Sequence, residues 1–254
     1  MIVIDSLGKE FGGVRALDAV SFSASPGEIV GIAGPNGAGK TTLLDLISGL
    51  EAPSSGSISL DGNRIDGLPA HQAAARGVAR TYQAPRLFSR MTAVENVVAG
   101  AHLRATDGFF GHALFLPTAR LARRSIERVA LEDLTALGFD GLSHVPAREL
   151  AEHQRRLVEI ARAMASLPSL LLLDEAFAPL EPGARTTLRD RLVAYARERK
   201  ATIFAAERDV SSCAGFCDRV VVLDAGSKIA DGTPAKVASD PDVRDAYLGV
   251  EWRQ

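Results

Sequence analysis

The sequence predicts an α/β fold whose core is a largely parallel β-sheet. Short apolar runs typical of buried strands recur along the chain, at residues 29–33, 170–173, 201–206 and 219–224. Segments with the pattern of helices, 43–49 and 183–199, lie between them. Alternation of strands and helices favours parallel pairing, because each helix carries the chain back across the sheet.

A second sheet and a helical region are expected beside this core. Residues 1–25 and 56–61 have strand character, and we expect them to form a small antiparallel sheet. Residues 92–165 are mostly helical by pattern, with an interruption rich in Gly, Phe and Pro at 107–117. A short helix is expected around residues 243–248.

Composition excludes several classes of protein. The chain has 254 residues, 46% of them hydrophobic, which suits one large domain or two closely joined lobes. Its net charge of −2 provides no basic field, so we expect no nucleic-acid partner. The longest purely apolar runs, such as 170–173, are far shorter than the roughly 18 residues of a membrane span. The chain begins directly on an expected strand, so we expect no signal peptide.

Two features leave alternatives open. A basic stretch is either a membrane-facing patch or a solvated helix face, of which we favour the second; its arginines are Arg104, Arg120, Arg123, Arg124 and Arg128. Cys213 and Cys217 lie four residues apart on an expected helix. A zinc site needs more ligands than these, so we expect two semi-buried thiols in a reducing compartment.

The strongest functional signal is a glycine-rich loop that fits the phosphate-binding pattern G-x-x-x-x-G-K-[ST]. It follows the strand at 29–33 and precedes the helix at 43–49, which is the setting that this motif requires. Its residues are Gly34, Pro35, Asn36, Gly37, Ala38, Gly39, Lys40, Thr41 and Thr42. Backbone amides of such a loop surround phosphates, with Lys40 at the β- and γ-phosphates and the Thr41 hydroxyl on Mg²⁺. We therefore expect the loop to bind a nucleotide.

Four further residues are candidates for a nucleotide site. Asp174 ends a buried strand, where a carboxylate can hold the water shell of Mg²⁺, and Glu175 can act as general base on an attacking water. Acidic residues in the first turn of a helix give the same pattern. The assignment of Asp174 and Glu175 therefore depends on the presence of the phosphate loop. Phe11, before two glycines, can stack on a base or belong to the core. Gln83 follows a further expected strand and leads into the helical region.

Along nearly its whole length the chain resembles the ATP-binding subunits of ABC transporters, above all those of branched-chain amino acid importers. The segments that carry the resemblance are residues 11–17, 34–42, 80–88, 91–97, 231–234, 240–243 and 246–249, together with the long insert at 104–128. The resemblance implies one P-loop NTPase domain over residues 1–254. It would have a mostly parallel core sheet, an antiparallel β subdomain, a helical subdomain at about 90–165 and a tail at about 226–254.

The resemblance also implies roles and partners. Phe11 is similar to the adenine-stacking aromatic, and Gln83 to the glutamine that contacts Mg²⁺ and couples the site to a permease. Asp174 and Glu175 resemble the metal-binding aspartate and the catalytic glutamate. Two such subunits would form a head-to-tail dimer at the cytoplasmic face of the membrane. Each ATP site would join one subunit's phosphate loop to its partner's signature motif.

The sequence departs from the family at two motifs and also after Glu175, where Ala176 and Pro179 stand at the family's proline and glycine. Residues 150–154 read Leu-Ala-Glu-His-Gln where the family has Leu-Ser-Gly-Gly-Gln, so Ala151 lacks the hydroxyl donor and Glu152 brings a negative charge. Arg208 stands at the position of the family's switch histidine. Arg208 can donate to a γ-phosphate, but it is longer and has no neutral form. A heterodimer tolerates such changes more easily than a homodimer.

We therefore expect an ATP-hydrolysing subunit of an importer for branched-chain or other hydrophobic amino acids. Its expected cofactors are ATP and Mg²⁺, with Lys40, Gln83 and Glu175 as catalytic residues. Its expected partners are a second ATPase subunit, membrane permeases and, indirectly, a periplasmic or extracellular solute-binding protein. The main alternative is a regulatory ATP-binding subunit with weak or no hydrolysis. A cytosolic ABC protein without a permease is disfavoured, because such proteins usually carry two of these modules in one chain.

Overall fold

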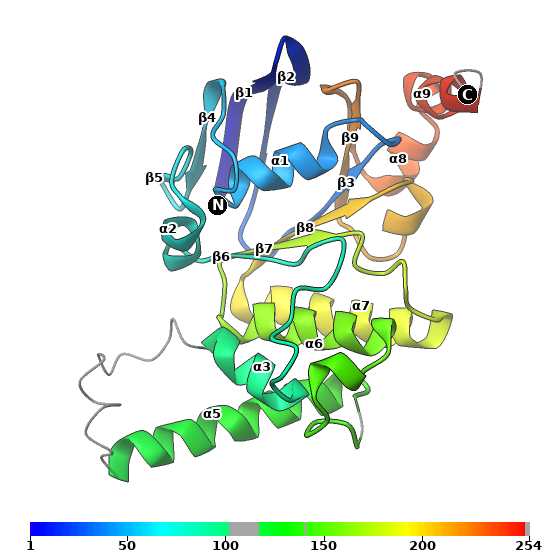
Figure 1. The fold of residues 1–254 in the computed structure, drawn as a ribbon. Coiled ribbons are helices and arrows are strands. Elements are labelled where there is room, and N and C mark those ends of the chain that lie inside the picture. The colour runs from blue at the N-terminus through cyan, green and yellow to red at the C-terminus, as the bar shows by residue number, and fades with distance from the viewer. Residues whose placement is uncertain (102–116, 140, 252–254) are drawn as a thin grey trace. The chain divides into compact units, whose positions relative to one another are not determined.

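The computed structural model describes residues 1–101, 117–139 and 141–251 (Figure 1). These residues form two compact units, which we take in turn. The first comprises residues 1–80, 169–175 and the chain from 193 onward, and the second comprises residues 81–168 and 176–192. Helix α7 (Pro182–Arg199) begins in the second unit and ends in the first.

The larger sheet of the first unit has six strands in the order β10-β9-β3-β8-β7-β6. Neighbours from β6 to β9 pair in parallel, and only β10 is antiparallel to its neighbour. The strands are β3 (Ile29–Ala33), β6 (Val78–Arg80), β7 (Leu170–Asp174), β8 (Thr202–Glu207), β9 (Arg219–Asp224) and β10 (Ser227–Gly232). The predicted α/β class with a mostly parallel core is confirmed.

The smaller sheet is antiparallel, as predicted, with the order β2-β1-β4-β5. Its strands are β1 (Ile2–Phe11), β2 (Val14–Ala24), β4 (Ser55–Leu60) and β5 (Asn63–Arg64). Helix α1 (Lys40–Ile47) begins three residues before the predicted helix, and its apolar side chains share one core with both sheets. This core fixes α1 between the two sheets of the first unit.

Further helices complete the first unit. They are α2 (Ala70–Ala75), α8 (Pro234–Ala238), α9 (Pro241–Glu251) and the 3₁₀ turn η3 (Ser211–Cys213). The expected helix through both cysteines is wrong: η3 ends at Cys213, and the chain then turns through Gly215 at φ +71°. Gly215 readily adopts this left-handed conformation, which ends helical winding. Both thiols are buried.

The second unit is mainly helical. Its helices are α3 (Ala93–Gly100), α5 (Pro117–Ala136), the 3₁₀ turn η2 (Ala147–Glu149), α6 (Glu152–Ala165) and the first part of α7. Thr92 caps α3 through a reciprocal pair of hydrogen bonds with Glu95. A Cβ atom on Gly100 would lie 2.1 Å from the carbonyl oxygen of Arg162, so glycine lets α3 approach α6 closely.

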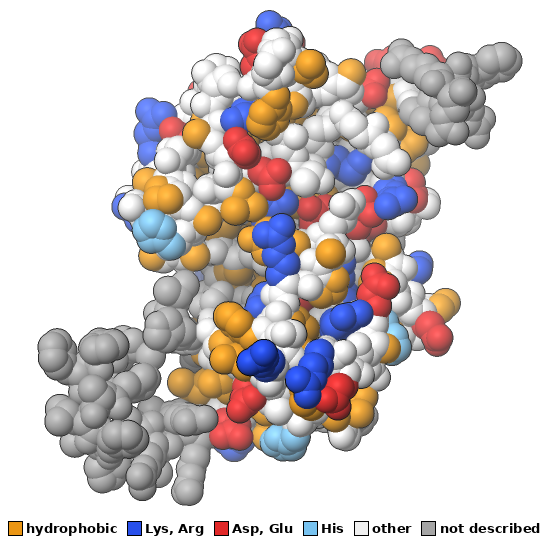
Figure 2. Space-filling model, in the orientation of Figure 1, with side chains coloured by type: hydrophobic (Ala, Val, Ile, Leu, Met, Phe, Trp, Pro, Cys, Tyr) orange, Lys and Arg blue, Asp and Glu red, His pale blue; other side chains and the backbone are white. Residues whose placement is uncertain are grey.

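The charges on the surface and the hydropathy of the helices bear on the expectations from composition. Acidic and basic side chains are interspersed over most of the face in Figure 2. Within the described ranges, none of the helices is long and apolar enough to cross a membrane. The expected interruption at 107–117 and Arg104 fall outside the described residues, apart from Pro117 at the start of α5. The structure does not describe the side chains of Arg120, Arg123 and Arg124.

Candidate nucleotide site

The phosphate loop joins β3 to α1 and needs glycine at specific points. Gly34 has φ +152°, and a Cβ atom there would lie 2.2 Å from the carbonyl oxygen of Leu223. Gly39 has φ +103°, and its Cβ would lie 2.7 Å from the carbonyl oxygen of Ala16. Gly39 is the N-cap of α1 and provides no capping side chain. The first amides of α1 are therefore available to an anion, as the motif predicts.

Lys40 folds back onto this loop. Its Nζ donates to the carbonyl oxygens of Gly34 at 2.6 Å and Pro35 at 2.9 Å, and its side chain is buried. Burial lowers the pKa of Lys40, and the carboxylates of Glu175 and Asp174 oppose this shift. The ammonium group thus lies where phosphate oxygens held by the loop amides can reach it.

Parallel topology brings the other candidate residues to the same edge. Strands β3, β8 and β7 are consecutive neighbours, so their carboxyl ends meet. The phosphate loop follows β3, Arg208 follows β8, and Asp174 and Glu175 lie at the end of β7. Ligands of open parallel sheets bind at this edge. The predicted convergence of these residues is therefore present within the first unit.

Asp174 is buried and held by an arginine for which the sequence suggested no role. Its Oδ2 accepts from Nη2 of Arg80 at 3.2 Å. Nη1 of Arg80 also donates to Asp45 on α1 at 2.6 Å and to Ser48, the C-cap of that helix, at 2.9 Å. Burial raises the pKa of Asp174, and the charge of Arg80 opposes that increase. A basic residue at the end of a short expected strand was the only signal in the sequence for this arrangement.

Glu175 lies directly after β7 in a left-handed conformation, with φ +46°. Its amide donates to the carbonyl oxygen of Ala206 at 3.0 Å, which holds the backbone against β8. Its Oε2 accepts from Nε of Arg208 at 2.9 Å and lies 2.8 Å from Nη2. The Arg208 side chain is 63% exposed, whereas that of Glu175 is only 11% exposed. An exposed guanidinium thus covers a mostly buried carboxylate.

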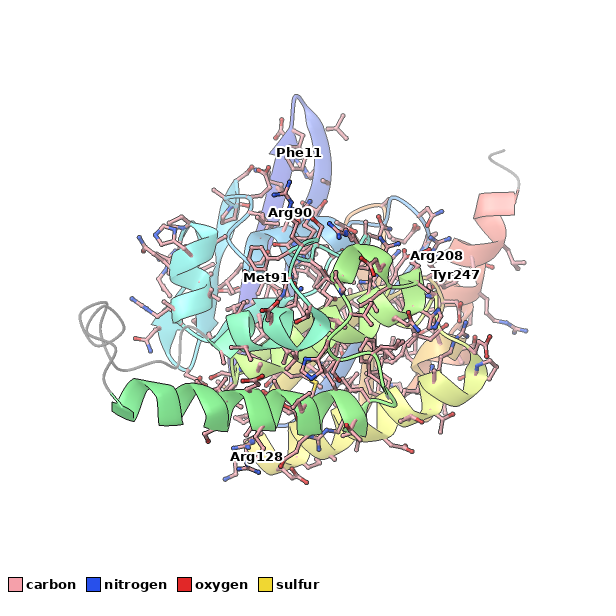
Figure 3. All side chains as sticks on the ribbon, turned by 60° about the horizontal axis from the view of Figure 1, so that its bottom comes forward. Phe11, Arg90, Met91, Arg128, Arg208 and Tyr247 are labelled. Carbon is pink, nitrogen blue, oxygen red and sulfur yellow. The ribbon has the colours of Figure 1, made fainter. Side chains whose placement is uncertain are left out.

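Phe11 ends β1 near the turn into β2 (Figure 3). Its side chain is exposed, and the ammonium group of Lys9 lies 4.6 Å from the ring centroid. Nζ of Lys9 also donates to Glu51 at 2.9 Å and to the carbonyl oxygen of Ala52 at 2.8 Å. Phe11 is therefore a surface aromatic ring beside a fixed cation and not a core residue.

Gln83 belongs to the second unit, unlike the residues above. The segment around it is held by two buried charged residues of α6, Arg156 and Glu159. Arg156 donates to the carbonyl oxygens of Tyr82 and Gln83, and Glu159 accepts from the amides of Tyr82 and Arg86. Arg156 and Glu159 bind each other at 2.8 Å. The sequence gives one signal for this pair, two charges on an otherwise apolar helix face.

The altered signature residues lie at the start of α6. Ala151 is the N-cap and offers no capping side chain, while Oε1 of Gln154 accepts from the Ala151 amide at 2.9 Å. Glu152 and His153 are exposed in the first turn. A carboxylate at this position interacts favourably with the positive end of the helix dipole and repels an incoming anion.

The family model described as ABC transporter matches residues 17–178, more than half of the chain. The chain belongs to the ABC transporter family. A second model, described as branched-chain amino acid ATP-binding cassette transporter, matches residues 227–252 of this ABC ATPase.

Two curated relatives align with almost the full length of the ABC ATPase. The high-affinity branched-chain amino acid transport ATP-binding protein BraF of Pseudomonas aeruginosa is 36% identical, and the alignment covers 98% of each chain. LivG of Escherichia coli, which carries the same description, has the same identity and coverage. A crystal structure described as the ADP conformation of an ATP-binding cassette has a TM-score of 0.81 and 26% identity, over 98% of each chain.

Proposed function

We propose that this ABC ATPase binds and hydrolyses ATP to drive import of branched-chain or other hydrophobic amino acids. The observation that carries the ATPase proposal is the meeting of Lys40, Asp174 and Glu175 with the phosphate loop at one sheet edge. The names of BraF and LivG and the match of the tail at residues 227–252 support the solute class. The proposed location is peripheral, on the cytoplasmic face of the membrane.

The proposed nucleotide contacts follow the chemistry of the side chains. Amides of residues 34–42 and the Lys40 ammonium would hold the phosphates, and Phe11 would stack on the adenine. Thr41 and Asp174 offer a hydroxyl and a carboxylate, which are the hard oxygen donors that Mg²⁺ prefers. No set of three or more acidic, His or Cys side chains that could hold a metal occurs in the described residues.

Hydrolysis would proceed by in-line attack of water on the γ-phosphate. Glu175 orients this water and takes its proton, and Lys40 stabilises charge on the phosphate oxygens. Mg²⁺ held by Thr41 and Asp174 would supply positive charge to the phosphates. Gln83 is proposed to contact the metal and to report the state of the site to the permease. Arg208 is proposed to donate to the γ-phosphate in place of the family's histidine.

The partner proposals rest on the altered signature. In a head-to-tail homodimer, Ala151, Glu152 and His153 would face both γ-phosphates. We therefore propose a heterodimer in which a second ATPase subunit with an intact signature completes this chain's own site. Membrane permeases and an external solute-binding protein would complete the importer.

A regulatory role with weak hydrolysis is the second candidate. The observation that favours it is the exposed Glu152 carboxylate in the first turn of α6, where a phosphate would otherwise bind. The two candidates share ATP binding and differ in turnover, so turnover in the assembled heterodimer separates them.

Calorimetric titration of MgATP into the isolated chain tests the shared step. We expect wild-type protein to bind, and Lys40→Ala to abolish binding because the loop loses its buried cation. Lys236→Ala, on the exposed side of α8, serves as the matched control. Absence of binding to folded wild-type protein contradicts the proposal. Loss of radiolabelled leucine uptake in cells that lack the gene would support the solute class.

A further inference from the structure

One guanidinium joins three elements of the first unit. Arg80 ends β6, and it binds Asp174 at the end of β7, Asp45 on α1 and Ser48, the C-cap of α1. The Arg80 and Asp174 side chains are almost completely buried, at 5% and 3% exposure. A buried, planar guanidinium with partners on both sides leaves its carboxylates little freedom to rotate.

The helix partner of Arg80 lies one turn beyond Thr41. Positions i and i+4 share a helix face, so Thr41 and Asp45 lie above one another on α1. Arg80 therefore connects Asp174 to the same helix face that begins with Thr41. These are the two residues of the first unit proposed above as metal ligands.

We propose that Arg80 is a positioning residue that fixes the Asp174 carboxylate relative to the Thr41 end of α1, so that both can serve one ATP-bound Mg²⁺. This inference rests on the proposed function. The side chain of Arg80 acts through Asp174 and Asp45. Groups that orient metal ligands in this way affect metal affinity although they touch no metal.

A purely stabilising role for Arg80 predicts a different outcome. A buried ion pair can hold three elements together without affecting ligand binding, and its loss then lowers the melting temperature alone. A positioning role predicts a selective loss of the affinity that Mg²⁺ adds to ATP binding. Nucleotide affinity measured in EDTA, which depends on the loop amides and Lys40, then stays unchanged.

Three variants probe the bridge at different points. Arg80→Met removes the charge, and Arg80→Lys keeps it but lacks the fork that reaches two carboxylates. Asp45→Ala removes the anchor on α1 and leaves Arg80 and Asp174 intact. Arg219→Lys is the matched control, because Arg219 also bridges two carboxylates of this unit, Glu28 and Asp231. Arg219 begins β9, at the sheet edge opposite the phosphate loop.

The experiment measures binding of a fluorescent ATP analogue to the full chain, with Mg²⁺ titrated from an EDTA baseline. We expect Arg80→Met and Asp45→Ala to weaken the apparent Mg²⁺ affinity by about 10- to 100-fold, as for other groups that orient ligands. Arg80→Lys should fall between these variants and wild type. Arg219→Lys should match wild type. Melting temperatures of all variants are recorded alongside.

The outcomes separate the inference from the function on which it rests. Absence of analogue binding by folded wild-type protein contradicts the proposed ATP binding. The positioning role alone is overturned if wild type binds the analogue and the variants keep the wild-type Mg²⁺ affinity. It is also overturned if the variants lose as much nucleotide affinity in EDTA as in Mg²⁺. If Arg80→Met does not fold, Asp45→Ala and Arg80→Lys decide the question by the same criterion.

Discussion

Arg208 holds Glu175 by two nitrogens on one carboxylate oxygen, Nε at 2.9 Å and Nη2 at 2.8 Å. The two residues follow neighbouring parallel strands, so the pair lies at the sheet edge that carries the phosphate loop. The hydrogen bond to Glu175 raises the pKa of Arg208, which therefore stays charged. A permanent cation thus contacts the proposed general base of this ABC ATPase.

Arg208→Ala is expected to lower ATP turnover of the assembled heterodimer. Removal of one positioned donor to transition-state charge typically costs about 100-fold or more in rate. Arg208→Lys keeps a charge without the fork and should recover part of the rate. Steady-state hydrolysis at saturating ATP measures this. Unchanged or faster hydrolysis by Arg208→Ala would mean that Arg208 only restrains Glu175.

Restoring the signature should increase hydrolysis by the isolated chain. The triple variant Ala151→Ser, Glu152→Gly, His153→Gly returns a hydroxyl donor and removes a carboxylate from the start of α6. Recovery of one missing hydrogen-bond donor alone should raise the hydrolysis rate roughly 100-fold. The measurement is turnover of the purified chain, with Glu175→Gln added to the triple variant to exclude a contaminating ATPase. Equal turnover before and after the repair contradicts the role given to the signature.

Tyr247 on α9 gives a prediction about stability and pH. Its hydroxyl is buried and has no hydrogen-bond partner of normal geometry among the described residues. Burial raises its pKa, the Asp209 carboxylate adds to this increase, and the Gly34 amide opposes it. Tyr247→Phe should therefore leave stability near neutral pH equal or higher, because the hydroxyl makes no hydrogen bond of normal geometry.

The sign of the pH effect follows from linkage. Above about pH 10, the ordinary tyrosine pKa, Tyr247 loses its proton in the unfolded chain before it does so in the folded chain. Stability of wild type therefore falls as pH rises above this value, and Tyr247→Phe should fall less steeply. Urea unfolding between neutral pH and pH 11 measures both. A large loss of stability in Tyr247→Phe at neutral pH would show that the hydroxyl has a partner.

Local sequence patterns predicted the main strands and the phosphate loop, but they did not predict contacts between residues distant in the sequence. The loop at 34–42 and the buried strand at 170–173 were predictable, because each depends on neighbouring residues. Arg80 binds Asp45 and Asp174, which lie 35 and 94 residues away in the sequence, and hydrophobic periodicity does not predict such contacts. The helix expected through Cys213 and Cys217 failed, because Gly215 turns the chain out of helical winding.

Single-turnover hydrolysis in the heterodimer, with the catalytic glutamate replaced in one subunit at a time, tests the central claim most directly. Lys40, Asp174, Glu175 and Arg208 lie together in this chain, so its own site should carry most of the hydrolysis. Glu175→Gln should therefore abolish most turnover, and the corresponding change in the partner should leave much of it. A near wild-type rate with Glu175→Gln, together with loss of turnover on changing the partner, would contradict the account and make this chain the regulatory subunit.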